Sequence, residues 1–187
     1  MGRAPALAID DRRAMIIECV IPLLLEHGRD VTSRQIAEAA GIAEGTVFRA
    51  FGDKETLIHA AASAFLEGTG AMGLDAAIDP ELALEEKLRI LVDGMRHRVR
   101  DVMRMASIAG TRGPAVAEAQ RLQFNAMVAT LLDRERDLLS VDVNDLGDYL
   151  RMFAIASSLP LGARQFSTDE LVALLQFGLL GAPSTKD

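Results

Sequence analysis

Residues 31–57, VTSRQIAEAAGIAEGTVFRAFGDKETL, decide the fold that we expect for this chain. Thr32 and Gln35 have the spacing of a capping box, in which their side chains satisfy two free backbone amides at the start of a helix. That helix is expected to end at Gly41, and a second short helix is expected from about Glu44 to Phe51. Two short helices joined by a tight turn have the form of a helix-turn-helix.

The small residues of this stretch explain how its two helices would pack. Ala37 and Gly41 allow the helices to cross closely, which leaves the outer face of the second helix free to enter a DNA major groove. On that face Arg49 is suited to a base or phosphate contact, and Lys54 of the following helix is suited to a phosphate contact. Spacing alone does not distinguish this arrangement from an ordinary helical corner.

Composition and apolar spacing predict an all-α chain. The 187 residues are 50% hydrophobic and only 4% aromatic, a mixture that favours helices over strands. We expect an N-terminal helix-turn-helix domain of three helices, residues 1–60, followed by a C-terminal helical bundle, residues 61–187. The glycine-rich residues 68–79 are the best candidate for a break between compact parts.

Local signals predict where several helices begin and end. Pro22 lies inside the first predicted helix, residues 13–27, and is expected to kink it. Asp79 and Pro80 are expected to start a long helix that is broken at residues 110–114. Further helices are expected from Phe124 to Leu139, from Asn144 to Leu159, and after a cap at residues 167–170.

Other functional classes lack the residues that they require. The net charge of −7 means that any DNA binding must depend on a local group of cations. One cysteine, Cys19, excludes a disulfide framework, and no apolar stretch reaches the roughly 20 residues of a membrane span, so we expect a cytoplasmic protein. The three histidines stand on separate predicted helices, so neither a metal nor a cofactor is expected.

Residues 68–73 spell GxGxxG, the fingerprint of a dinucleotide-binding turn. That motif requires a preceding strand, whereas here a helical run comes before it, so a loop is the better interpretation. No motif of a nucleophilic hydrolase, a phosphate-binding loop or a zinc protease occurs, and we expect no enzymatic activity.

Residues 13–60 resemble the DNA-binding domain of the tetracycline-repressor (TetR) family. The matching elements keep the family's order and spacing without gaps: Glu26-His27-Gly28, Thr32, Ile36-Ala37-Glu38-Ala39-Ala40-Gly41-Ile42, Gly45-Thr46-Val47-Phe48, Phe51 and Lys54-Glu55-Thr56-Leu57. The resemblance implies a homodimeric transcription regulator, usually a repressor, that binds double-stranded operator DNA. It further implies that a small molecule bound to the C-terminal bundle releases the protein from DNA.

The resemblance also implies which residues bind DNA. The start of the first motif helix would hold the DNA backbone, the second helix would face the groove, and the next helix would contact a phosphate: Thr32, Ser33, Arg34, Glu44, Gly45, Thr46, Phe48, Arg49 and Lys54. Three positions depart from the family, because Ala43, Glu44 and Phe48 stand where Ser, Lys and Tyr are common. These departures predict modest affinity with strong salt dependence.

The C-terminal bundle offers candidates for a ligand pocket. Its flexible methionines and neighbouring side chains suit a small apolar or amphipathic ligand, and the candidates are Met95, His97, Val99, Met103, Phe124, Met127 and Phe153. Core packing is the simpler interpretation for each of these apolar residues on its own. The same holds for Met105 and Met152, which have the same helical spacing. Ligand binding would swing the helix from Asp53 to Glu67 and so change the separation of two recognition helices.

The last two predicted helices carry more apolar surface than a small bundle needs. We expect them to form a two-fold, four-helix dimer interface through Leu146, Tyr149, Leu150, Leu171, Leu174, Leu175 and Leu179. That symmetry would place both recognition helices on one DNA face, so the operator would be nearly palindromic.

Two alternatives to a DNA-binding regulator remain open at the level of sequence. The departures at Ala43, Glu44 and Phe48 are compatible with a helix-turn-helix-shaped module that binds proteins and not DNA. A helical-bundle enzyme is the other, although no acid–base pair has a sensible spacing.

Overall fold

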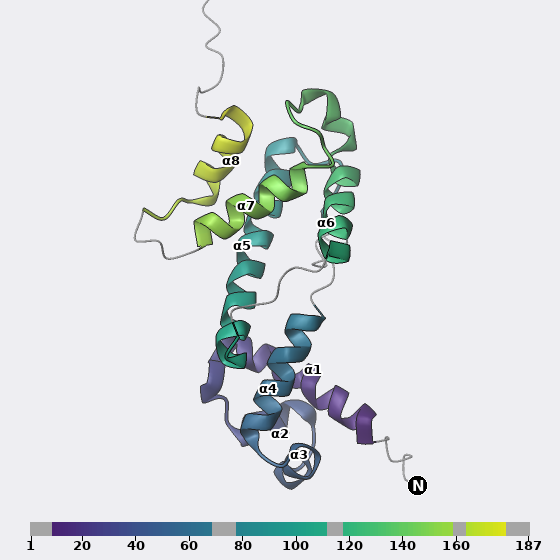
Figure 1. Cartoon of the computed structure of the whole chain (residues 1–187), viewed down its shortest axis with the longest axis vertical. Helices are drawn as coiled ribbons and strands as arrows, with labels where there is room; N and C mark the ends of the chain where they lie inside the picture. Colours follow the sequence, from purple (N-terminus) through teal and green to yellow (C-terminus); the bar gives the residue numbers. More distant parts are fainter. Residues whose placement is uncertain (1–8, 69–77, 112–117, 159–163, 179–187) are drawn as a thin grey trace, which may run out of the picture. The chain divides into compact units, whose positions relative to one another are not determined.

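The computed structural model describes residues 9–68, 78–111, 118–158 and 164–178 (Figure 1). These residues form helices and loops and contain no strand, which confirms the prediction of an all-α chain. The helices in chain order are α1 (Ile9–His27), the 3-10 helix η1 (Gly28–Asp30), α2 (Ser33–Ala40), α3 (Glu44–Phe51), α4 (Lys54–Glu67), α5 (Leu84–Ala109), α6 (Glu118–Leu131), the 3-10 helix η2 (Asp133–Leu138), α7 (Leu146–Ser158) and α8 (Thr168–Phe177).

The chain divides into two compact units. The N-terminal unit comprises residues 1–69 and 101–115, and the C-terminal unit comprises residues 70–100 and 116–187. The long helix α5 contributes to both, because its last turns belong to the N-terminal unit. Domains at 1–60 and 61–187 stay a prediction, although α4 runs through residue 60 as one continuous helix.

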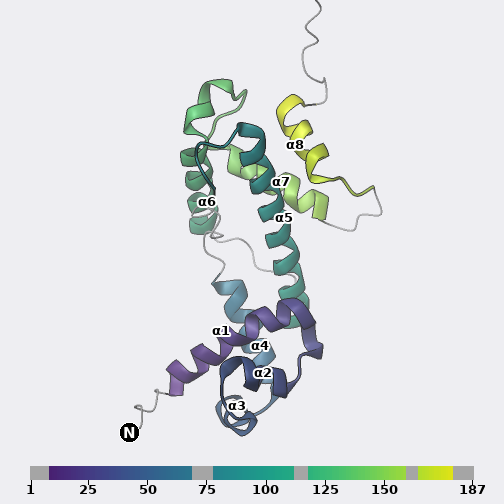
Figure 2. The same cartoon turned by 180° about the vertical axis from the view of Figure 1, so that it is seen from behind.

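The core of the N-terminal unit is built on one face of α1. Ile16, Val20 and Leu24 are fully buried at a spacing of four residues, the repeat that places side chains on one helix face. They pack in a cluster with apolar residues of α4, which crosses α1 in both views (Figures 1 and 2). Met105, near the end of α5, is also fully buried in this cluster.

Pro22 does not end α1. The helix continues from Ile9 to His27 with the proline inside it. A proline removes the amide that would pair with the carbonyl four residues earlier, here that of Glu18. Pro22 and Glu18 are both exposed, so water can satisfy the freed carbonyl and the core is unaffected.

The core of the C-terminal unit gathers apolar residues from α5, α6, α7 and α8. Leu91, Val128 and Leu150 are fully buried in it, and α6 and α7 pack against each other. Among the predicted core residues, Met103 and Met152 are instead exposed, at 47% and 57%. Apolar spacing identifies a helix face but not whether another helix of the same chain covers it.

One buried charge also belongs to this unit. Lys87 of α5 is fully buried, and its Nζ donates to Glu135 Oε1 at 2.7 Å and to the Leu131 carbonyl at 3.3 Å. A buried ammonium is tolerated only when it is paired in this way. The pair therefore fixes η2 against α5.

Two predicted helix boundaries are wrong. The Asp79–Pro80 pair forms a turn, in which Asp79 Oδ1 accepts from the Glu81 amide at 2.9 Å, and α5 begins only at Leu84. The helix expected through Leu139 ends as an α-helix at Leu131, and η2 follows it. In contrast, the predicted cap of the last helix is confirmed, because Ser167 and Glu170 form a capping box at the start of α8.

Gly147 of α7 is expected to tolerate no larger residue. A Cβ at this position would lie 2.3 Å from Asn125 Oδ1 and 3.0 Å from the Asn125 Cα, so backbone as well as side chain would have to move. Gly147→Ala should reduce the free energy of unfolding by about 1–3 kcal/mol, measured by urea denaturation followed by circular dichroism.

The matched control for this substitution is Gly45→Ala in α3. A Cβ at Gly45 would meet no atom within 4 Å, so this variant should gain about 0.5–1 kcal/mol from the better helix propensity of alanine. Equal effects of the two substitutions would contradict the close packing of α7 on α6.

Candidate nucleic-acid interface

The helix-turn-helix begins with the capping box expected from the sequence, and the structure confirms it. The Gln35 amide donates to Thr32 Oγ1 at 3.2 Å, and the Thr32 amide donates to Gln35 Oε1 at 2.8 Å. After α2, Gly41 adopts a left-handed conformation with φ of 64°, and the Ile42 amide donates to the Ala37 carbonyl at 3.0 Å. Glycine adopts this conformation without steric cost, so the chain can turn sharply into α3.

Helix α3 presents one apolar face and one exposed face. Val47 and Phe51 are buried in the core of the N-terminal unit, at 3% and 6% exposure. The opposite side is exposed over Glu44, Gly45, Phe48 and Arg49, with Thr46 half-buried between the two faces. This outer surface of α3 is the candidate recognition face.

The start of α3 lacks a side-chain cap. Ala43 occupies the N-cap position with an extended backbone, φ −73° and ψ 143°, and makes no side-chain hydrogen bond. The alanine side chain has no oxygen to accept from the first amides of the helix, and the Thr46 amide donates instead to the Ala43 backbone carbonyl at 2.8 Å.

Two arginines near the recognition face, Arg49 and Arg34, form hydrogen bonds or an ion pair with residues of their own helices. Arg49 folds back along α3, where it donates to the Gly45 carbonyl at 3.1 Å and to Thr46 Oγ1 at 3.3 Å. Arg34 pairs with Glu38 one turn along α2, at 2.8 Å, and both side chains are largely exposed. Exposed pairs of this kind are weak, so both arginines can exchange these partners for phosphate.

Sequence reasoning missed Arg13 as a member of this surface. It lies on α1, and its guanidinium stands 4.9 Å from the centre of the Phe51 ring at the end of α3. The residue is exposed, so the ring holds a cation beside the candidate recognition helix. Nothing in the local sequence signals this contact, because the two residues are far apart in the chain.

Lys54 has a structural role that the sequence did not suggest. Its Nζ donates to the carbonyls of Val31 at 2.9 Å and Arg29 at 3.2 Å. These bonds tie the start of α4 to the loop before α2. The predicted phosphate contact of Lys54 stays a prediction, since a phosphate would have to compete with both carbonyls.

Two arginines connect the end of α5 to the helix-turn-helix. Arg104 of α5 donates to the Glu26 carbonyl in the last turn of α1 at 3.0 Å, and Arg29 donates to the Ile108 carbonyl in the last turn of α5 at 3.2 Å. Carbonyls in the last turn of a helix have no partner within the helix, and cations are favourable there. Each arginine therefore caps the helix that lies across from it.

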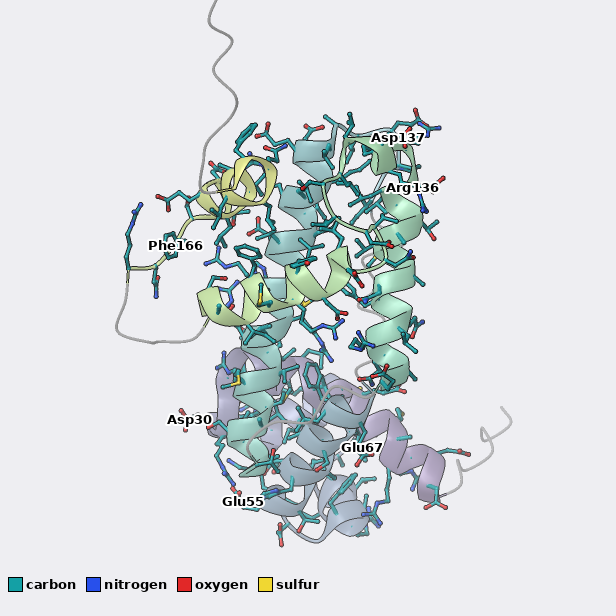
Figure 3. The ribbon with its side chains drawn as sticks, turned by 45° about the horizontal axis from the view of Figure 1, so that its top comes forward. Asp30, Glu55, Glu67, Arg136, Asp137 and Phe166 are labelled. Carbon is teal, nitrogen blue, oxygen red and sulfur yellow. The ribbon has the colours of Figure 1, made fainter. Side chains whose placement is uncertain are left out.

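Arg29 also forms an ion pair with Glu55 at the start of α4, with Nη2 and Oε2 separated by 2.6 Å. Figure 3 shows Glu55 among the side chains of the N-terminal unit. The hydrogen bond from Arg29 is the main cause that lowers the pKa of Glu55. We call Arg29, Glu55, Lys54 and Arg104 the arginine–glutamate cluster. It joins the ends of α1 and α5 to the start of α4.

The predicted ligand-pocket residues do not converge on one pocket in the described part of the chain. Met127 lines a hollow of about 380 Å³ near Ile78 and Pro80, and Phe153 lines a separate hollow of about 380 Å³. Met95 and Phe124 are buried in the core, and Val99 is half-buried against it. His97 and Met103 are exposed. The seven residues remain a prediction as a ligand site.

The predicted dimer residues also divide into groups. Leu146, Leu150 and Leu171 are buried within the C-terminal unit, at 6%, 0% and 3% exposure. Leu174 and Leu175 are half-buried, Tyr149 is 41% exposed, and Leu179 lies outside the described residues. Sequence reasoning missed three exposed apolar residues on the same two helices, Met152, Ile155 and Phe177.

Within residues 9–68, 78–111, 118–158 and 164–178, no group of three or more His, Cys, Asp or Glu side chains is placed to hold a metal ion. No helix in that part of the chain has the length and apolar character needed to cross a membrane. From Thr69 onward, the GxGxxG segment lies outside the described residues.

Comparisons with known proteins agree with the helix-turn-helix. Residues 21–61 match the family model described as bacterial regulatory proteins, tetR family, which confirms the predicted resemblance. Two uncharacterized HTH-type transcriptional regulators of Mycobacterium tuberculosis, MT0489 and Rv0472c, are each 21% identical to this chain over 174 residues. The match covers 88% of this chain and 74% of each regulator.

Solved structures with limited similarity were also found. The TetR transcriptional regulator SCO0520 from Streptomyces coelicolor is 23% identical, with 88% of this chain and 95% of that chain covered and a TM-score of 0.47. The fatty acid degradation regulator FadR from Bacillus halodurans is 18% identical, with 97% and 100% covered and a TM-score of 0.43.

A serine at position 43 should stabilise the recognition helix. Ala43→Ser supplies an oxygen at an N-cap whose backbone is already extended, and should add about 1 kcal/mol to the free energy of unfolding in urea. Ala43→Val, which has no acceptor, is the control. Equal stability of the two variants would contradict the uncapped start of α3.

The ion pair between Arg29 and Glu55 should make stability depend on pH. Because the pKa of Glu55 is lowered in the folded state, its contribution is present above the unfolded pKa and is lost as pH falls through the folded pKa. The difference in unfolding free energy between the wild type and Glu55→Gln should therefore shrink between about pH 5 and about pH 3.

The control for this pH dependence is the same comparison made in an Arg29→Ala background. Without the guanidinium, the difference caused by Glu55→Gln should vary much less with pH. A pH-dependent difference of equal size in both backgrounds would exclude Arg29 as its cause.

Proposed function

Because residues 21–61 match the family model of the tetR bacterial regulatory proteins, we propose that this chain is a transcriptional repressor of the TetR family. As a homodimer it binds a nearly palindromic operator, and a small molecule releases it. The observation that carries the proposal is the exposed face of α3, whose other side is anchored in the core by Val47 and Phe51. We assign no enzymatic activity to the chain.

The recognition face supplies the contacts to DNA. Arg49 exchanges its bonds within α3 for a base edge or a phosphate, and Glu44 accepts a hydrogen bond from a cytosine amine. Gly45, Thr46 and Phe48 approach the groove beside them. The uncapped start of α3 and the acidic Glu44 limit the affinity, which makes binding modest and sensitive to salt.

Contacts to the DNA backbone come from residues around the recognition helix. Thr32, Ser33 and Arg34 at the start of α2 contact phosphates, and Arg13 adds a cation from α1. Lys54 acts chiefly by holding the loop before α2 through its two carbonyl bonds, and a phosphate contact is secondary.

Dimerisation uses the last two helices of the C-terminal unit. Met152 and Ile155, three positions apart on α7, are exposed at 57% and 39%. Large apolar side chains exposed on one face of a helix are typical of a protein interface. A second copy of the chain related by a two-fold axis covers it and sets the spacing of the two recognition helices.

Release from DNA depends on α5, since this helix contributes residues to both units. A ligand that changes the position of α5 alters the bonds of Arg104 to α1 and of Arg29 to the end of α5. Because Arg29 also pairs with Glu55, the change reaches the start of α4 and swings that helix.

Arg49→Ala should weaken binding to the operator at least roughly tenfold, because it removes a charged contact to a base or phosphate. The operator is first identified by incubating sheared genomic DNA with the purified, ligand-free chain and sequencing the retained fragments. Affinity for the enriched site is then measured by fluorescence anisotropy at two salt concentrations.

Arg136→Ala is the matched control for Arg49→Ala. Arg136 lies in η2 of the C-terminal unit and pairs locally with Asp133 at 3.0 Å, so its loss should leave operator affinity unchanged. If no site is enriched and no small molecule is found in an extract of the denatured protein, the chain is a helix-turn-helix-shaped module without DNA binding.

A further inference from the structure

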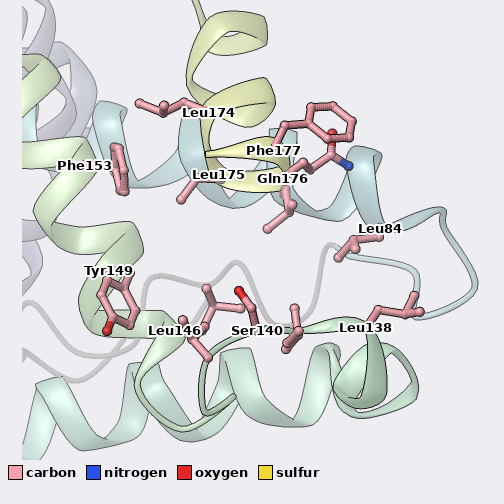
Figure 4. Close-up of a pocket in the computed structure, with 13 residues that line it drawn as sticks. Leu84, Leu138, Ser140, Leu146, Tyr149, Phe153, Leu174, Leu175, Gln176 and Phe177 are labelled. Atoms are coloured by element: carbon pink, nitrogen blue, oxygen red, sulfur yellow. The ribbon is translucent and has the colours of Figure 1, made fainter. Parts of the chain in front are cut away.

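An apolar hollow of about 380 Å³ lies within the C-terminal unit. Four segments of the unit surround it: the start of α5, the end of η2 with the residues that follow it, α7 and α8. Figure 4 shows Leu175 of α8 and Leu146 of α7 on different sides of the same space. The volume falls within the range of pockets that bind small molecules, roughly 300–1,000 Å³.

Among the residues that the structure describes, none that lines this hollow has a charged side chain. Its polar side chains are those of Ser140, Tyr149 and Gln176, and the remaining side chains are aliphatic or phenyl groups. A carboxylate or an ammonium group placed among them would lose its hydration without gaining an opposite charge. The lining therefore favours a neutral molecule with at most one or two hydrogen-bonding groups.

Four large apolar side chains around the hollow are exposed. Leu138 is 75% exposed, Phe177 50%, Tyr149 41% and Val141 37%. Scattered exposed apolar residues are ordinary, but here they surround one concavity. A ligand in the hollow removes apolar surface of all four from water.

We propose that this hollow binds a neutral, largely aliphatic small molecule as the effector of the regulator. The inference rests on the proposed function, since it names the class of ligand that acts on it. A second copy of the chain is the other occupant to consider. The surface that suits a second copy is the neighbouring strip of α7 at Met152 and Ile155, which does not line the hollow.

Tyr149 provides a direct probe of the hollow. It is the only tyrosine of a chain that has no tryptophan, so the intrinsic fluorescence of the protein reports on this one side chain. The intact, ligand-free chain is titrated with decanol and, separately, with decanoate, which differ in charge but share an alkyl chain.

Decanol should produce a saturable change in Tyr149 fluorescence and raise the melting temperature. Decanoate should bind at least roughly tenfold more weakly, because its charge finds no partner. Equal binding of the two would overturn the assignment to neutral ligands, and no saturable change with decanol would overturn the pocket itself.

Leu174→Gln tests the site at one residue of its lining. Leu174 is half-buried, and an amide at this position should weaken decanol binding at least roughly tenfold. Leu122→Gln is the control, since Leu122 is a 53% exposed leucine of α6 that does not line the hollow. Circular dichroism establishes that both variants are folded, and equal affinities would contradict the proposal.

Light scattering separates a ligand pocket from a dimer contact. If Leu174→Gln halves the molecular mass while decanol causes no change in fluorescence, a second copy covers the hollow and the proposal is wrong. The titrations contain no DNA, so their result does not depend on whether the chain binds an operator. Saturable decanol binding without release from the operator would refute the effector role and leave the DNA-binding function intact.

Discussion

The last turns of α5 close the core of the N-terminal unit, and the candidate DNA-binding surface depends on them. Met105 is fully buried there together with Ile16 of α1 and Leu57 of α4. Arg104 and Arg29 then bond the ends of α1 and α5 to each other's backbone. A chain cut at residue 60 would divide α4 and leave this core open, so the DNA-binding unit includes residues distant in sequence.

The arginine–glutamate cluster matters because it bonds the end of α5 to the helices of the DNA-binding unit. Each of its bonds is exposed or half-buried and is weak on its own, but together they join α1, α4 and the end of α5. Buried apolar contacts provide most of the stability, at about 1.5–3 kcal/mol for each large side chain. The charged groups specify how the helix ends meet, and weak bonds of this kind can rearrange when a ligand binds.

The features that sequence reasoning predicted correctly are local. The capping box at Thr32, the helix end at Gly41 and the cap at Ser167 each depend on residues within a few positions of one another. The boundary at Asp79 was wrong although its signal was also local, because the same side chain stabilises a turn by accepting from the Glu81 amide. Asp79 is suited both to capping a helix and to stabilising a turn, so its presence in the sequence could not decide between the two.

The features that the sequence could not reveal depend on distant partners. Lys87 and Glu135 are 48 residues apart, and Arg29 and Ile108 are 79 apart. Helical periodicity assigned Leu146 and Leu150 to an apolar face, but the same chain buries them, which leaves Met152 and Ile155 exposed. The helical spacing of apolar residues therefore cannot tell which face of a helix is left for a second molecule to cover. That depends on how the helices of the unit pack.

Hydrogen exchange of the intact chain, measured with and without its selected operator, tests the central claim most directly. Amides of residues 33–51, in α2 and α3, should exchange more slowly in the complex, because the DNA covers the recognition face there. Unchanged exchange in residues 33–51, together with slowing confined to another segment, would show that a different surface binds the DNA.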